Sequence, residues 1–171
     1  LAVLLFSINT LFYARINNSM QEMDDVYASN AQITELGQVF EDVQDSMYQY
    51  LKVKSSQALM SYYQNEAKYR QELELLNDQN IEDSVKLLEK KIRNMSESYL
   101  SCTAATVAAK RGRNVEKYRQ KYDDSLELYS YIQGSMDELN KQLFKENSQT
   151  YGALRAVMRY LEISNTAIML L

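Results

Sequence analysis

Five basic residues stand beside two predicted turns, and they are the side chains best suited to binding an anion. They are Lys52, Lys54, Lys110, Arg111 and Arg113. Clustered cations attract a polyanionic wall polymer or an acidic ligand. Cations near the end of a helix also stabilise the helix dipole, and that is their ordinary role. The sequence favours this second, structural interpretation of the cluster.

Tyrosines form a second group with possible binding chemistry, because the chain holds fourteen tyrosines and no tryptophan. The six that fall at helical spacing are Tyr62, Tyr69, Tyr99, Tyr118, Tyr122 and Tyr129. Such rings can line a cleft for a small molecule. They can instead pack in a narrow core while their hydroxyls reach water. The spacing favours packing, since aromatic stripes of this period usually face the interior of a protein.

Polar residues interrupt the apolar stripes at Asn30, Glu66, Thr106, Ser125 and Glu146. They form either a ligand or ion site inside the protein or positions that fix helix register, as a buried asparagine does in coiled coils. The second interpretation is favoured, because a solvated end satisfies polar groups without a ligand. If a ligand binds, the candidate residues drawn from these three groups are Tyr62, Glu66, Tyr69, Tyr118, Tyr122, Lys110, Arg111 and Arg113.

The residues that are missing exclude several classes of function. The sequence contains no histidine, which removes histidine-based acid–base catalysis and the usual metal ligands. Its one cysteine, Cys102, cannot form an internal disulfide. The net charge of −4, with acids and bases interspersed, argues against nucleic-acid binding. We expect no catalytic residues, no metal and no cofactor, and hence no enzyme in this part of the protein.

The elements that must position these residues are long helices, because the chain has no proline and only four glycines. Apolar residues at steps of three and four predict helices that end near Val53, Leu76 and Arg111. A fourth helix is predicted to run from Val115 to the end of the sequence. An all-α fold follows from this pattern.

Polar residues mark the three predicted turns. The run Lys54-Ser55-Ser56 is expected to supply the first turn and a cap for the second helix, Asn77–Asn80 form the middle turn, and Asn114 is suited to cap the fourth helix. Gly112 is expected to take the left-handed conformation just after the third helix.

Short turns make successive helices antiparallel, which predicts an up-down-up-down four-helix bundle with long first and last helices. Counting outward from the turns places the distal four-helix bundle at 30–147 and a membrane-proximal two-helix stalk at 13–29 and 148–167. The same count brings Ile8 level with Met169. The apolar segments 1–12 and 168–171 are therefore expected to belong to two truncated membrane spans.

Two lone helices bury little surface, so the stalk is expected to pair with a second copy of the chain. The residues expected to line that homodimer seam are Met20, Met23, Val26, Leu154, Met158 and Leu161.

Several short runs resemble one protein family. They are Asp25–Asn30, Tyr50-Leu51 followed by Lys54-Ser55-Ser56, Arg111–Asn114 with Tyr118 and Tyr122, and Asn147 with Tyr151. They are similar to the outer sensing region of YesM-like bacterial sensor histidine kinases. The resemblance implies a homodimer on the extracytoplasmic side of the cell membrane, two flanking spans, and a cytoplasmic kinase core after residue 171.

The expected function is therefore signal sensing for a two-component system. The signal is expected from an unknown small-molecule or envelope ligand, or from a partner binding protein. Two alternatives stay open on the sequence alone: the ligand-binding bundle of a methyl-accepting chemoreceptor, and a structural coiled-coil stalk that senses nothing. Each of the three predicts a different sequence after residue 171.

Overall fold

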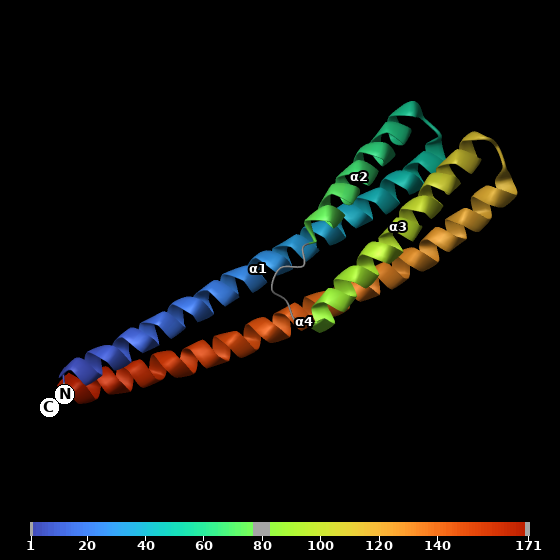
Figure 1. The fold of residues 1–171 in the computed structure, drawn as a ribbon. Helices are drawn as coiled ribbons and strands as arrows, with labels where there is room; N and C mark the ends of the chain where they lie inside the picture. Colours follow the sequence, from blue (N-terminus) through green and yellow to red (C-terminus); the bar gives the residue numbers. More distant parts are fainter. Residues whose placement is uncertain (1, 77–82, 170–171) are drawn as a thin grey trace. The chain divides into compact units, whose positions relative to one another are not determined.

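The computed structural model describes residues 2–76 and 83–169, and its regular elements there are all α-helices. They are α1 (Ala2–Val53), α2 (Ser56–Leu75), α3 (Asp83–Arg111) and α4 (Val115–Met169) (Figure 1). The predicted all-α class is confirmed. The predicted turn at 77–80 lies outside the described residues, as do the side chains of the segment 168–171.

The chain divides into two compact units. We call Ala31–Lys141 the bundle unit, and Leu1–Asn30 together with Gln142–Leu171 the two-helix unit. Helices α1 and α4 contribute residues to both units. The assignment of any part to a stalk or to a membrane stays a prediction.

Polar contacts in the bundle unit define how α2 lies against its neighbours. Lys68 is ion-paired with Glu35 of α1 at 3.0 Å, and Asn65 donates a hydrogen bond to the Asp42 carbonyl at 3.0 Å. Residue numbers fall along α2 as they rise along α1, so the two helices are antiparallel. The pairs Tyr62–Thr103 and Tyr69–Ser96 give the same relation between α2 and α3.

An aromatic cluster joins all four helices in one core. The ring of Phe40 from α1 lies 5.1 Å from that of Tyr69, 4.8 Å from Tyr99 and 4.7 Å from Tyr129, measured between centroids. Apolar side chains at helical spacing extend this core in both directions, because each helix presents one face to it. They include Leu36, Val43, Met47, Leu73, Val85, Ile92, Leu100, Ile132 and Leu139.

The carbonyls at the end of α2 receive side-chain donors from two neighbouring helices. The Gln32 amide donates to the Leu75 carbonyl, and the Arg93 guanidinium donates to the Leu76 carbonyl. The last carbonyls of a helix have no partner inside the helix. These two bonds therefore close the end of α2 without a glycine cap.

Side-chain caps begin α2 and α4 as the sequence predicts. The Ala58 amide donates to the Ser55 hydroxyl at 3.1 Å, and the Lys117 amide donates to the Asn114 side-chain oxygen at 3.1 Å. Each bond satisfies one of the free amides in the first turn of its helix. The predicted cap at Asn114 is confirmed, and the cap predicted within Lys54-Ser55-Ser56 is Ser55.

The prediction for Gly112 is wrong, because the left-handed residue after α3 is Arg113, with a φ of 58°. The Asn114 amide donates to the Ala109 carbonyl at 2.9 Å, and the Arg113 amide donates to the Lys110 carbonyl at 3.3 Å. These are the two bonds of a Schellman motif, which requires its left-handed residue one position later than Gly112. Lys54 occupies the corresponding position after α1, with a φ of 51°.

The two-helix unit buries few of its described apolar side chains. Leu143 and Leu154 are buried, whereas Leu11, Met20, Tyr151, Met158 and Ile163 are exposed. Within residues 2–76 and 83–169, no helix contains an apolar stretch long enough to cross a bilayer. A large part of the apolar surface of this unit therefore faces solvent in a single chain.

Candidate functional site

Three of the eight candidate ligand-binding residues lie on α2: Tyr62, Glu66 and Tyr69. Tyr62 and Tyr69 are wholly buried. The Tyr62 hydroxyl donates to the Thr103 hydroxyl at 2.9 Å, and the Tyr69 hydroxyl shares a 2.6 Å hydrogen bond with Ser96. Glu66 lies one turn from Tyr62 and accepts from Arg70 at 2.8 Å. All three side chains are engaged within the protein.

Burial keeps the interior tyrosines protonated. Desolvation raises the pKa of Tyr62, Tyr69 and Tyr99 far above the ordinary value for tyrosine, because a phenolate loses its hydration in the core. The Tyr99 hydroxyl donates to the Gln44 side chain at 2.8 Å. These rings act as packing groups whose hydroxyls are satisfied by residues on other helices, so they do not line an open cleft.

The other five candidates gather where α1 and α3 end and α2 and α4 begin. The Lys110 ammonium lies 4.8 Å from the centre of the Tyr118 ring, and the Tyr118 and Tyr122 rings are 6.5 Å apart. Burial raises the pKa of Tyr50, and the nearby positive charge of Arg111 opposes that rise. Arg113 is exposed in the turn itself. The two turns lie side by side (Figure 1).

Charge is strongly segregated at this end of the bundle unit. Segments 48–60 and 103–122 contain eight lysines and arginines and one acid, Glu116, for a formal charge of +7. The rest of the chain therefore carries −11, since the whole chain carries −4. We call seven of these cations the basic end: Lys52, Lys54, Lys110, Arg111, Arg113, Lys117 and Arg119.

Every cation of the basic end except Lys110 is exposed, and Lys110 is half-buried. In the described part of the chain, none of the seven forms an ion pair with a carboxylate. The eighth cation of these segments, Lys121, is paired with Asp124 at 2.8 Å. The basic end therefore presents a positive surface that the chain does not itself neutralise.

An exposed apolar face of α2, which we call the α2 groove, begins beside the basic end. It is shallow and open, and it is lined by residues of α2 alone: Ser56, Leu59, Met60, Tyr63, Gln64 and Ala67. Met60 is 64 % exposed and Tyr63 is 46 % exposed. The sequence contained the signal for this groove, because Met60, Tyr63 and Ala67 follow helical spacing. The groove was not predicted, because helical periodicity was used only to find the face of each helix that is buried in the core.

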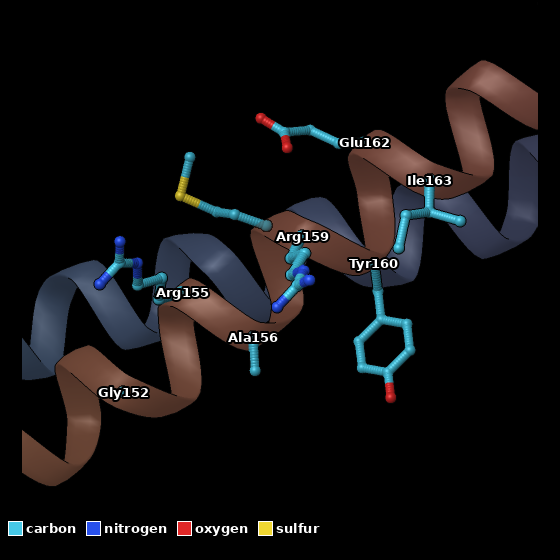
Figure 2. Close-up of a pocket in the computed structure, with 8 residues that line it drawn as sticks. Gly152, Arg155, Ala156, Arg159, Tyr160, Glu162 and Ile163 are labelled. Atoms are coloured by element: carbon cyan, nitrogen blue, oxygen red, sulfur yellow. The ribbon is translucent and has the colours of Figure 1, made fainter.

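The hollow on the two-helix unit is lined by residues of α4 alone. They are Gly152, Arg155, Ala156, Met158, Arg159, Tyr160, Glu162 and Ile163. Figure 2 shows Tyr160 and Ala156 directed to one side of the helix and Glu162 to the opposite side. Residues that point apart on one helix cannot enclose a small molecule, so we treat this stretch as an uncovered helix surface.

No metal-binding cluster accompanies these surfaces. Over the described residues, no three histidine, cysteine, aspartate or glutamate side chains gather around a point that could hold a metal ion.

Comparison with known proteins places the fold. No protein-family model and no curated protein matches the sequence. A chain from a solved structure titled "XylFII-LytSN complex" is similar in structure, with a TM-score of 0.64 at 17 % sequence identity. The similarity covers 70 % of this chain and 98 % of that chain. This chain therefore shares an all-helical fold with a component of that complex.

Proposed function

We propose that this chain is the extracytoplasmic sensing domain of a two-component sensor histidine kinase. The observation that carries the proposal is the fold shared with a chain of the XylFII-LytSN complex, since LytSN is the sensor domain of a histidine kinase. The chain's own residues support the same role, because the exposed basic end and the exposed apolar face of α2 offer surfaces to a partner. Catalysis in the parent protein would belong to a cytoplasmic domain, and the sequence that follows residue 171 tests this directly.

The proposed architecture is an antiparallel up-down-up-down bundle that stands on a stalk next to the membrane. The antiparallel pairs α1–α2 and α2–α3 support the bundle, and the core cluster around Phe40 brings in α4. The two-helix unit would form the stalk, with the membrane spans at 1–12 and 168–171. In this proposal, helices α1 and α4 carry the signal, because they are the helices that contribute to both units.

A flexible insertion in α4 is expected to uncouple sensing from output in the full-length receptor. Two glycines inserted after Gly152 break the helical hydrogen-bond ladder and add backbone freedom. We expect kinase autophosphorylation in membrane vesicles to become independent of the state of the bundle unit. The matched control places the same two glycines between Asp78 and Gln79, in the turn predicted from the sequence, and should leave regulation intact. Unchanged regulation after the Gly152 insertion would refute transmission through a continuous α4.

We also propose that the two-helix unit is covered by a second copy of the chain. Its apolar side chains on α4 include Met158, which is exposed, and Leu161, which is half-buried; at a spacing of three residues they share one helix face. Symmetric pairing buries such surfaces in most soluble oligomers. Sedimentation equilibrium of the purified chain should show a dimer, and the double variant M158D/L161D should raise its dissociation constant at least tenfold.

The control for this dimer is the double variant L75D/L87D, which changes two exposed leucines of the bundle unit. It introduces the same two charges and should dimerise like the unchanged chain. A monomer at every concentration, or equal weakening by both variants, would exclude the proposed pairing.

A further inference from the structure

We propose that the basic end and the α2 groove together form a docking surface for an acidic protein. The partner would present aspartates and glutamates around an apolar patch. This inference deepens the proposed sensing function, on which its biological meaning rests, by naming where a protein partner contacts the bundle unit. Four observations carry it.

The first observation is that helix stability explains only some of the cations. Lys52, Lys110 and Arg111 lie in the last turns of α1 and α3, where positive charge is favourable. Lys117 instead lies in the first turn of α4, where the dipole disfavours a cation. Its position is unfavourable for the helix, so stabilisation of helix dipoles does not account for the whole basic end.

The second observation is the backbone conformation of the two turn cations. Lys54 and Arg113 both adopt the left-handed conformation, with φ of 51° and 58°. Glycine is the usual residue there, because a side chain makes this conformation unfavourable. The chain thus places a long cation where glycine is usual at both turns, and both of these side chains are exposed at the basic end.

The third observation is the imbalance of charge. The basic end keeps seven cations without a carboxylate partner in the described residues, on a chain whose remainder is strongly acidic. An acidic surface would be drawn to this end and repelled elsewhere, which fixes orientation and speeds association at low salt. Charge complementarity therefore identifies the chemistry of the partner.

The fourth observation separates a protein from a simple polyanion. Val53, the last residue of α1, and Val115, the first residue of α4, are exposed beside the two turns, at 58 % and 59 %. Met60 and Tyr63 lie about 9 to 14 Å further along α2 from Lys54, at ~1.5 Å per residue. Protein interfaces combine aromatic residues, methionine and arginine around an apolar centre. A polyphosphate or a similar polymer has no apolar group to place in the α2 groove.

The test uses the purified 171-residue chain and three fluorescein-labelled probes. The first is a 20-residue amphipathic peptide with glutamates on one helical face and leucines on the other. The second is an all-acidic peptide with the same number of glutamates, and the third is polyphosphate. Fluorescence anisotropy at low salt measures the dissociation constant of each probe. We expect the amphipathic peptide to bind at least tenfold more tightly than the all-acidic peptide.

Two variants and one matched control test the two parts of the surface. The variant K54E/R111E/R113E should weaken binding of the amphipathic peptide at least tenfold, and M60S/Y63S should weaken it about fivefold while leaving the all-acidic peptide unaffected. The control K90E/K91E/K141E reverses three exposed cations elsewhere in the bundle unit and should change binding less than twofold. If the charge reversal lowers helicity measured by circular dichroism, K54Q/R111Q/R113Q replaces it.

Three results would overturn the docking surface. Tighter binding of polyphosphate that M60S/Y63S leaves unchanged would make the basic end a site for polyanions. Equal loss in the control variant would show non-specific attraction, and no loss in the charge-reversal or neutral variants would exclude the basic end. These measurements do not depend on kinase output, so the docking surface and the proposed sensing function can fail separately.

Discussion

Replacing Phe40 by alanine is expected to lower the free energy of unfolding of the chain by about 3 to 5 kcal/mol. The Phe40 ring contacts Tyr69, Tyr99 and Tyr129, which come from the three other helices. The substitution removes the transfer free energy of the ring and leaves a cavity that four rigid helices cannot fully close. Urea unfolding followed by circular dichroism measures the loss.

A matched control is available because Phe144 is 70 % exposed. Phe144→Ala should change the free energy of unfolding by no more than about 0.5 kcal/mol. Phe40→Leu keeps part of the volume and should cost less than Phe40→Ala. A loss of under about 1 kcal/mol for Phe40→Ala would show that the aromatic cluster does not hold the four helices together.

The local features of this fold could be predicted because they depend on neighbouring residues. The caps at Ser55 and Asn114 follow from a polar side chain three residues before a free amide. The ends of α1 and α3 at Val53 and Arg111 follow from the turn residues that come directly after them, Lys54-Ser55-Ser56 and Gly112. The Gly112 prediction failed because residue preference was used where hydrogen-bond geometry decides. The Schellman bonds of Asn114 and Arg113 assign the left-handed conformation to Arg113.

The candidate surfaces could be predicted only in part, because they depend on residues far apart in the sequence. The partner of the Tyr99 hydroxyl is Gln44, which lies 55 positions away and on no predicted stripe. The basic residues were recognised, but their significance was not. That they form no ion pairs with carboxylates in the described residues can be recognised only from the structure, in which the two turns lie side by side. The α2 groove likewise could be assigned to the docking surface only from its exposure and its closeness to Lys54 in the structure.

Alkaline solution is expected to unfold the bundle unit steeply above about pH 10, the ordinary pKa of tyrosine. Burial raises the pKa of Tyr62, Tyr69 and Tyr99, so the unfolded chain loses these protons at a lower pH than the folded chain does. Their contribution to stability is therefore fully present below pH 10 and is lost as pH rises above it. Three such groups give a slope of about 4 kcal/mol per pH unit, at ~1.4 kcal/mol for each.

The loss can be followed by two signals that must change together. Tyrosinate absorbance near 295 nm reports ionisation, and circular dichroism at 222 nm reports helix content. Exposed tyrosines ionise without loss of helix, whereas the three interior ones ionise only as the bundle unit opens. The variant Y62F/Y69F/Y99F should lose much of the slope between pH 10 and pH 11, and Y13F/Y27F/Y131F, which changes three exposed tyrosines, should keep it. Ionisation of every tyrosine near pH 10 with full helicity retained would mean that the hydroxyls of Tyr62, Tyr69 and Tyr99 reach water, and that the core around Phe40 is open instead of packed.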